Sequence, residues 1–384
     1  MSEYAAPRVL FYVQHLLGIG HLMRSMRICE ALYEADAHVT LVTGGMPVKG
    51  VPPEGVHHVQ LNPIAVRNGD FSAIVDSAGN DIDDTFKSER CSHLLSVYQN
   101  IQPDLVVLEA FPFGRRQLRF ELLPLLESIA QSESKPVVVS SIRDVLQRST
   151  KAGRDDYVLD LIHRHFDGVM VHGDPEFSTL SDSFPRAHEF DEKIVYTGLV
   201  CAKPVDEITE SFDIVVSAGG GAVGADLLMA AVEAAKLLPK SLSWCVITGP
   251  NSPMIRHFDS MAATLPNVHF ESFRSDFPNV LKSAQMSVSQ SGYNTVSDIL
   301  KAKCRCLLVP YSAAGETEQL DRARRLETLG IARVLYNEEL SGAAMAASIS
   351  ESLREARPSG ELMLNTEGAA QSAQILLNLI ADKH

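Results

Sequence analysis

Short apolar runs alternate with segments of helical periodicity along most of the chain. In the first half, residues 8–14 and 38–43 are expected to form strands on either side of a helix over residues 22–35. This strand–helix–strand order is typical of a parallel sheet covered by helices. Further elements of the first half are strands over 104–108, 136–140, 168–172 and 193–197 and a helix over 84–101, while the rest of the polar stretch 51–91 is expected to form loops.

The alternation resumes after an irregular stretch. Residues 201–211 lack apolar periodicity and are expected to link two domains, residues 1–200 and 212–365. The elements expected beyond this linker are strands over 213–217, 243–248, 268–271, 286–289 and 306–309 and helices over 226–238, 295–301 and 368–382. The sequence therefore predicts an α/β protein with two doubly wound, Rossmann-like domains, which face each other across a cleft at the carboxyl ends of their strands.

Composition and charge narrow the class of protein. The chain has 384 residues, 45% of them hydrophobic, and a net charge of −14, and both halves contain more acidic than basic residues. A nucleic-acid partner is not expected, because phosphate backbones bind to concentrated basic surfaces. The six cysteines are scattered, which predicts reduced thiols in the cytoplasm and no metal site. No apolar run is long enough to predict a membrane-spanning helix.

A glycine-flanked histidine stands between the first strand and the first helix. In the segment Gly18-Ile-Gly20-His21, the glycines permit a tight turn, and the helix N-terminus presents N–H groups to a polar or anionic ligand. Glu109, at the carboxyl end of a buried strand, is placed to hold a neighbouring histidine in one tautomer and orientation. His21 and Glu109 are the predicted catalytic pair, with His15 as an alternative base.

Each of these residues also has a purely structural interpretation. His21 can simply begin a helix, and Glu109 can form an ion pair with Arg115 or Arg116. Arg143, at the end of the next strand, is a weaker candidate of the same kind, because the aspartate that follows it can cap a helix.

The second half begins with a strand that runs into a glycine-rich loop containing Gly220, Gly221 and Gly224. Backbone N–H groups of such a loop can approach a diphosphate without a carboxylate to repel it. A nicotinamide-binding site would carry an acidic residue at the end of the next strand, where this chain has the sequence WCVITGP over residues 244–250. The lysine of a P-loop is also absent. A redox Rossmann site is therefore disfavoured, and a merely structural turn stays open.

Two further strand ends carry polar residues. Four small or polar residues follow the first of them, namely Ser291, Gly292, Asn294 and Thr295. They lead into a helix with Asp298 one turn in, so helix N–H groups would hold phosphate while the carboxylate binds a ribose. Glu318 and Gln319 follow the second strand end, placed to bind sugar hydroxyls. Taken alone, each acidic residue is equally explained as a helix-start carboxylate favoured by the helix dipole.

Together these segments resemble the GT-B nucleotide-sugar glycosyltransferases of family 28, in the branch around the bacterial peptidoglycan N-acetylglucosaminyltransferase. The likeness rests on SGYNTVSD over residues 291–298, the strand ending VPY at 309–311 and the pair Glu318-Gln319, and it is strongest over residues 212–332.

The resemblance implies a role for each part. The glycine-rich loop would approach the diphosphate, Asp298 would bind the ribose diol, and Glu318 with Gln319 would bind the transferred sugar. The backbone at Phe273 and Arg274 would contact the uracil ring. The C-terminal helix, residues 366–384, would pack back on the N-terminal domain.

Two residues depart from the family pattern, and one motif points to a second chemistry. Asp298 stands where the family has Glu, and Ala222 stands where it has a phosphate-contacting Ser. At the N-terminus, Gly18-x-Gly-His21-x-x-Arg24 also resembles the related UDP-sugar hydrolase of nonulosonic acid biosynthesis, which directs water to the anomeric carbon.

By this resemblance the protein is expected to be an inverting, metal-independent glycosyltransferase that uses a UDP-sugar as co-substrate and no other cofactor. The alternatives are a nucleotide-sugar hydrolase and a non-catalytic nucleotide-sugar-binding protein. The acceptor stays open between an anionic molecule, favoured by Arg115, Arg116 and Arg119, and a lipid-linked one met at the inner membrane face. The residues expected on the acceptor side are Gly18, Gly20, Arg24, Arg115, Arg116 and Arg143.

Overall fold

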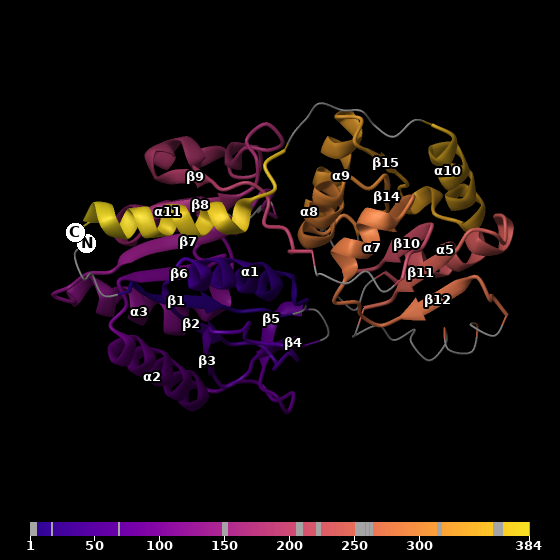
Figure 1. The fold of residues 1–384 in the computed structure, drawn as a ribbon. Helices are drawn as coiled ribbons and strands as arrows, with labels where there is room; N and C mark the ends of the chain where they lie inside the picture. Colours follow the sequence, from indigo (N-terminus) through magenta and orange to yellow (C-terminus); the bar gives the residue numbers. More distant parts are fainter. Residues whose placement is uncertain are drawn as a thin grey trace. The chain divides into compact units, whose positions relative to one another are not determined.

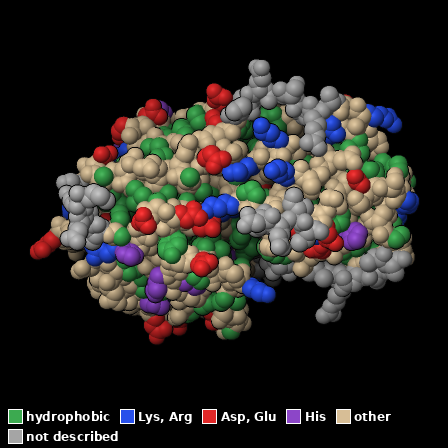
Figure 2. Space-filling model, viewed as in Figure 1, with side chains coloured by type: hydrophobic (Ala, Val, Ile, Leu, Met, Phe, Trp, Pro, Cys, Tyr) green, Lys and Arg blue, Asp and Glu red, His purple; other side chains and the backbone are tan. Residues whose placement is uncertain are grey.

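The chain forms two compact units, residues 1–200 with 367–384 and residues 201–366. The computed structural model describes residues 6–16, 18–67, 70–147, 153–204, 210–219, 224–249, 258, 261, 264–312, 317–355 and 364–383. Figure 1 shows the ribbon of each unit, with helices covering a sheet. In Figure 2, acidic and basic side chains both occur across the visible face, interspersed with hydrophobic ones.

The first unit is built on a parallel sheet of seven strands within the described residues. Their order is β3 (His57–Gln60), β2 (His38–Thr43), β1 (Arg8–Val13), β6 (Leu105–Glu109), β7 (Val137–Arg143), β8 (Gly168–His172) and β9 (Ile194–Tyr196). Its helices are α1 (Gly20–Glu34), α2 (Asp84–Ile101), α3 (Arg119–Gln131), α4 (Arg154–His165) and α11 (Gly368–Lys383), with short 3₁₀ segments η1 (Arg116–Leu118), η2 (Leu180–Asp182) and η3 (Pro185–Lys193). The central strands are buried along nearly all of their length, as continuous apolar runs in helix-covered parallel sheets are.

The last helix, α11, belongs to the first unit although 166 residues of the second unit precede it in sequence. Its start is joined to the first unit by a β-bridge between Val200 and Glu367. At its other end, Lys383 Nζ lies 3.1 Å from Asp167 Oδ2. Figure 1 shows the helix beside α1 and the sheet.

The second unit repeats the same design with a parallel sheet of six strands in its described part. Their order is β12 (Val268–Glu271), β11 (Trp244–Ile247), β10 (Ile214–Ser217), β13 (Met286–Ser289), β14 (Cys306–Leu308) and β15 (Ala332–Val334). Its helices are α5 (Ala225–Leu237), α7 (Phe277–Ser283), α8 (Tyr293–Ala302), α9 (Glu318–Thr328) and α10 (Gly342–Arg354), with a 3₁₀ segment η5 (Asn337–Glu339).

Strand order gives each sheet one point where ligands are expected. In the first unit the chain runs outward from β1 in both directions, so the order reverses between β1 and β6. In the second unit the reversal lies between β10 and β13. In open α/β sheets, ligands bind at the carboxyl ends of the strands beside such a reversal. The loops after these four strands are therefore the places to examine.

The predicted α/β class with two Rossmann-like units is confirmed. The secondary structure predicted for one region of the first unit is wrong. The polar stretch 51–91 contains strand β3 and a hairpin of β4 (Ala65–Arg67) and β5 (Asp70–Val75) where loops were expected. Short strands with little apolar alternation, such as His57–Gln60, give no periodic signal, and β3 forms because it pairs with β2.

The first residues of the predicted linker are part of the second unit. Cys201 Sγ donates to the main-chain oxygen of Ser297 at 3.2 Å, and the N–H of Ala202 donates to Asp298 Oδ1 at 2.7 Å. Through these hydrogen bonds to α8, the chain from residue 201 onward belongs to the second unit. All six cysteines are free thiols, and among the described residues no helix is long and apolar enough to span a bilayer.

Candidate active site

His21 and Glu109 lie together at the strand-order reversal of the first unit. His21 is the second residue of α1, directly after β1, and Glu109 is the last residue of β6. The His21 Nδ1 atom lies 2.6 Å from Glu109 Oε1. Because a carboxylate accepts, neutral His21 carries its proton on Nδ1 and has its lone pair on Nε2. Nε2 has no hydrogen-bond partner in the described structure, and the side chain stays 18% exposed.

The charges around this pair keep the carboxylate ionised and the imidazole neutral. Burial alone would raise the pKa of Glu109, but the interaction with His21 and the charges of Arg24 and Arg115 lower it to about 2. Burial lowers the pKa of His21 to about 3, although Glu109 opposes that shift. At neutral pH the pair is therefore an uncharged imidazole held by a charged carboxylate.

His15, the alternative base, is less accessible. Its Nε2 lies 2.9 Å from the main-chain oxygen of Met46, which fixes Nε2–H as the donor. The remaining nitrogen, Nδ1, is buried without a hydrogen-bond partner. A Cβ at Gly45 would come within 2.6 Å of Nδ1, so this atom faces the backbone of the neighbouring loop. Of the two histidines, His21 is the more exposed, with 18% of its side chain accessible, whereas His15 is 6% exposed.

The other residues predicted on the acceptor side are spread along the same sheet edge. Gly18 precedes α1 and has open space around it, and Gly20 begins the helix. Arg115 follows β6 with a φ of 58°, and Arg116 is exposed in η1. Arg143 ends β7. The alternative ion pair of Glu109 with Arg115 or Arg116 is not formed in the described structure; Glu109 Oε1 pairs with Arg24 and His21, and its Oε2 is buried without a hydrogen-bond partner.

A second buried histidine at this edge was not predicted. His172 ends β8 and is fully buried, with Nε2 2.7 Å from Ser141 Oγ and Nδ1 2.9 Å from Thr197 Oγ1. Ser372 Oγ of α11 lies 3.4 Å from Nδ1. The sequence feature that could have identified His172 is its position at the end of a predicted strand. Both ring nitrogens face hydroxyl groups inside the unit, so His172 holds strands and α11 together.

These histidines predict that the protein is sensitive to acid. Burial lowers the pKa of His15, His21 and His172 below the ordinary value of 6.5. Below pH 6.5 the unfolded chain therefore binds more protons than the folded one, so the free energy of unfolding should fall as the pH falls. Thermal midpoints between pH 8 and pH 4 should drop on the acid side, with a shallower drop in His172→Gln. A flat midpoint over this range would contradict the burial of these rings.

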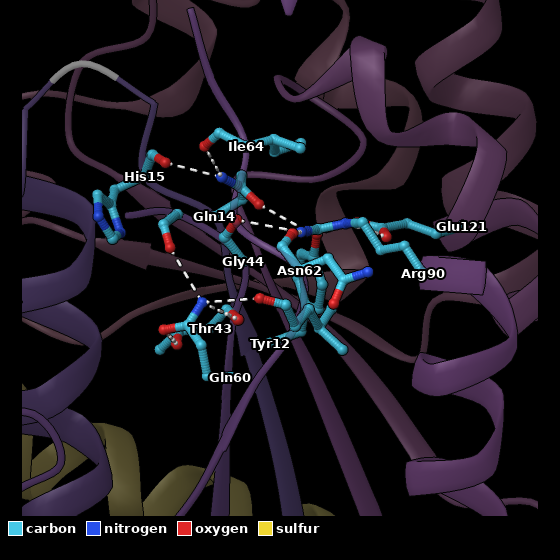
Figure 3. A network of polar contacts seen from close by, with 12 residues as sticks. Tyr12, Gln14, His15, Thr43, Gly44, Gln60, Asn62, Ile64, Arg90 and Glu121 are labelled. Carbon is cyan, nitrogen blue, oxygen red and sulfur yellow. Dashed lines mark hydrogen bonds and ion pairs between the residues drawn. The ribbon is translucent and has the colours of Figure 1, made fainter. Parts of the chain in front are cut away.

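A buried arginine positions the loops next to His15 (Figure 3). Arg90 of α2 has no solvent exposure, and its Nε donates to Glu121 Oε2 of α3 at 2.6 Å. Its Nη2 donates to Gln14 Oε1 at 2.8 Å, and Nη1 donates to the main-chain oxygens of Gly44, at 3.1 Å, and Asn62. A single guanidinium thus fastens the segments that follow β1, β2 and β3 to two helices.

Two neighbours complete this network. Tyr12 Oη donates to Glu121 Oε1 at 2.5 Å, and Gln14 Nε2 donates to the main-chain oxygens of His15 at 2.8 Å and Ile64 at 3.3 Å. Figure 3 shows Gln14 between Arg90 and the His15 backbone. The position of the β1 loop, which leads to His21, therefore depends on Arg90.

In the second unit, the glycine-rich loop follows β10 at the strand-order reversal. Gly220 and Gly221 lie outside the described residues, whereas Gly224 has a φ of 110° and begins α5. A Cβ at Gly224 would lie 2.9 Å from Ala218 Cβ and 3.0 Å from Gln290 Nε2. The position therefore requires glycine for both its φ and its close packing.

A buried arginine also joins the donor-side residues. Arg322 of α9 has no exposure, and it donates to the main-chain oxygen of Ser291 and to Glu318 Oε1, both at 2.9 Å. Its guanidinium lies over the Tyr293 ring, 5.7 Å from the centroid. Ser291 Oγ in turn donates to the main-chain oxygen of Gln319 at 2.8 Å. The two predicted donor segments, after β13 and β14, are therefore in direct contact.

Arg322 was missed by the sequence reasoning. Arg322 lies four residues after Glu318, and this spacing on a helix favours ion pairs. The spacing is the sequence feature that could have identified Arg322. Gln319 Oε1 accepts from the N–H of Tyr311 at 3.2 Å, which orients its amide.

Asp298 and Arg274 already have partners. Asp298 is buried on α8, with Oδ1 on the N–H of Ala202. Arg274 pairs with Glu210, Glu271 and Asp276 at 2.7–3.0 Å. The adjacent Phe273 is 56% exposed. The Arg274 side chain is thus committed to an ion cluster, and the contacts of Asp298 and Phe273 with a nucleotide stay predictions.

Three helices begin at the two reversals without a side-chain cap. The N-cap residues are Ile19 for α1, Gly224 for α5 and Gly292 for α8, and none forms a side-chain capping hydrogen bond. Asn294 and Thr295 lie in the first turn of α8. Such helix ends attract anions through their N–H groups and dipole.

Comparison with known proteins identifies the second unit. Residues 214–376, from β10 into α11, match the model of the glycosyltransferase family 28 C-terminal domain. This segment is a family 28 domain. The family 28 domain contains Gly224, Ser291, Asp298 and Glu318, so the donor-side residues predicted from the sequence fall within it.

Curated relatives share sequence with part of the chain. The UDP-N-acetylglucosamine–N-acetylmuramyl-(pentapeptide) pyrophosphoryl-undecaprenol N-acetylglucosamine transferase of Thermotoga neapolitana is 24% identical over 180 residues, covering 46% of this chain and 51% of that protein. The enzyme of the same name from Geobacillus kaustophilus is 32% identical over 124 residues, or 32% and 34% of the two chains. The chain thus spans about half of the first of these relatives and about a third of the second.

Solved structures share the whole fold. The calicheamicin glycosyltransferase CalG4 superposes with a TM-score of 0.61 and 15% identity, over 99% of this chain and 97% of that one. MurG of Acinetobacter baumannii gives 0.57 and 14%, over 98% and 99%. These glycosyltransferases show that the chain with the family 28 domain has the GT-B fold, as the sequence predicted.

Proposed function

We propose that the protein is an inverting glycosyltransferase that moves a sugar from a UDP-sugar to an acceptor hydroxyl, with His21 as the general base. One observation carries the proposal. At the strand-order reversal of the first unit, a partly buried histidine is held in a single tautomer by a buried carboxylate, with Nε2 unoccupied. The family 28 domain supports the nucleotide-sugar donor.

The reaction needs one proton transfer and one displacement. His21 Nε2 takes the proton of the acceptor hydroxyl, and the hydroxyl oxygen attacks the anomeric carbon from the side opposite the UDP. The bond between the anomeric carbon and the diphosphate oxygen breaks, UDP leaves with the electron pair, and the anomeric configuration inverts. Glu109 stabilises the imidazolium that forms.

The leaving diphosphate requires stabilisation of its negative charge. The N-terminal ends of α5 and α8 have no side-chain caps, so their free N–H groups can stabilise this negative charge. Such stabilisation needs no metal ion. Ser291, Glu318 and Gln319, joined through Arg322, would line the sugar side.

We propose that the protein binds its acceptor in the cytoplasm. The names of the curated relatives specify an undecaprenyl diphosphate acceptor, so a lipid-linked hydroxyl at the inner membrane face is one candidate.

Calorimetric titration with UDP tests the donor site. Asp298→Asn retains an oxygen for the Ala202 N–H but removes the charge, so it should weaken UDP binding about 10- to 100-fold, as expected for loss of a charged hydrogen bond. Glu338→Gln, an equal change in charge at an exposed position of η5, should leave binding unchanged. Folded wild-type protein that binds no UDP would refute the proposal. Release of UDP from UDP-sugars, with and without an added acceptor, then separates transfer from hydrolysis, and a chelator tests whether the reaction needs a metal ion.

A further inference from the structure

Arg24 lies beside His21 on the first helix and shares its carboxylate. It follows His21 by three residues on α1, a spacing that puts both side chains on the same side of the helix. The guanidinium, only 2% exposed, forms an ion pair with Glu109 Oε1, the oxygen that also accepts from His21 Nδ1. Arg24 was predicted on the acceptor side, and the structure places its side chain on the carboxylate of the predicted catalytic pair.

The base function of His21 depends on how many protons the His21–Glu109 pair holds. With one proton, on Nδ1, the pair carries a single negative charge and Nε2 keeps its lone pair. A second proton makes the pair neutral overall, as imidazolium with carboxylate or as imidazole with carboxylic acid. The imidazolium has protons on both nitrogens, and a carboxylic acid that donates to Nδ1 leaves the ring proton on Nε2. In both two-proton forms Nε2 is therefore occupied, and His21 cannot accept a proton there.

Burial makes the negative charge of the one-proton form costly. The Glu109 side chain has no solvent exposure, and a buried carboxylate without a cation takes up a proton. Burial alone raises the pKa of Glu109, whereas the interaction with His21 and the charges of Arg24 and Arg115 lower it. With the Arg24 guanidinium in contact, the buried group of three side chains is neutral when the pair holds one proton.

Other charged or titratable groups face the pair from the neighbouring strand ends. They are Arg115 after β6, Arg143 at the end of β7 and His172 at the end of β8. Neither of these two arginines forms an ion pair with Glu109 in the described structure, and both ring nitrogens of His172 lie against hydroxyl groups. Arg24 is therefore the cation that contacts the carboxylate directly.

We propose that Arg24 is a positioning residue for the reaction, because its charge limits the His21–Glu109 pair to one proton and so keeps the Nε2 lone pair available to the acceptor hydroxyl. This inference rests on the proposed function, which assigns that lone pair to proton removal. In this role Arg24 acts through Glu109 and needs no contact with either substrate. An arginine suits the task because its guanidinium stays charged when buried.

Nitrogen-15 NMR of the free protein, labelled at histidine, tests the proposal without any substrate. The His21 signals are identified by their absence in His21→Gln. At pH 7 the wild type should carry a proton on Nδ1 and none on Nε2, whereas Arg24→Met should carry one on Nε2. Arg24→Lys retains a positive charge and should leave Nε2 unprotonated. Arg27→Met removes the same charge one turn further along α1, where the side chain donates to the main-chain oxygen of Val200, and should match the wild type.

The pH dependence of turnover separates this role from simple packing. At pH 7 the kcat of Arg24→Met should fall about 10- to 100-fold, and the loss should shrink as the pH rises to about 9.5, where the second proton dissociates. Arg24→Lys should recover most of the loss at pH 7. A loss of packing would lower kcat to the same extent at every pH. A pH-independent loss, or an unprotonated Nε2 in Arg24→Met at pH 7, would overturn the proposal.

A double variant keeps the test decisive if Arg24→Met does not fold. Arg24→Met/Glu109→Gln removes both buried charges, so its folding beside an unfolded Arg24→Met would show that the carboxylate requires the Arg24 charge, as proposed. Failure of both variants to fold would show that Arg24 is needed for packing, and would overturn the proposal. Absence of UDP binding in the wild type would refute the proposed function, while the protonation of His21 would still report on Arg24.

Discussion

Replacing His21 by glutamine should lower kcat by about 10²- to 10⁴-fold, the usual contribution of a positioned general base. Glutamine can still donate to Glu109 Oε1, so the buried carboxylate keeps a hydrogen bond, but it offers no basic nitrogen to the acceptor. UDP affinity should not change, because the donor residues belong to the other unit. The measurement is UDP release at saturating donor, together with calorimetric titration of UDP.

Two further results define the role of His21. His15→Gln should keep near-wild-type turnover, since a glutamine can preserve the bond to Met46, and a loss confined to this variant would transfer the role to His15. Because the pKa of His21 is lowered to about 3, the wild-type rate should not decline through protonation of this base as the pH falls from 8 to 5. An acid limb with an apparent pKa near 6.5 that disappears in His21→Gln would contradict the buried environment described for the imidazole.

Replacing Arg90 by methionine should lower the free energy of unfolding by about 3–5 kcal/mol, because it leaves Glu121 buried without its cation. The same change removes the donors that satisfy Gln14 and the main-chain oxygens of Gly44 and Asn62. Urea unfolding followed by far-UV circular dichroism measures the loss.

Two controls make the Arg90 experiment specific. Arg164→Met breaks an exposed pair with Asp160 and should cost less than about 1 kcal/mol. The single tryptophan, Trp244, is buried in the second unit, so its fluorescence reports on that unit. The circular dichroism transition should shift while the fluorescence transition stays in place. An Arg90→Met protein as stable as Arg164→Met would show that the network is not needed for the fold.

Much of the fold follows from patterns that are local in the sequence. Continuous apolar runs such as residues 105–109 predict buried parallel strands, and polar residues at their carboxyl ends predict the site. For this reason the sequence alone predicts that His21 and Glu109, 88 positions apart, form a pair. Strand β3 escaped prediction because its pairing with β2, not its own pattern, makes it a strand.

The positioning residues could not be predicted in the same way. Arg90 meets Glu121 across 31 positions and Gln14 across 76, and nothing in the surrounding helix distinguishes a buried arginine from an exposed one. The partner of Glu109 is equally hidden, because the carboxylate pairs with Arg24 of α1 and not with the nearby Arg115 or Arg116.

The return of α11 to the first unit sets the order in which the nascent chain can fold on the ribosome. The first unit requires residues 367–384, which are translated after the whole of the second unit. At about 5–20 residues per second, residues 201–366 take roughly 10–30 s to synthesise. During that time the surface that α11 will cover, including His172 opposite Ser372, lacks its partner. The second unit is therefore synthesised whole before the first unit can be completed.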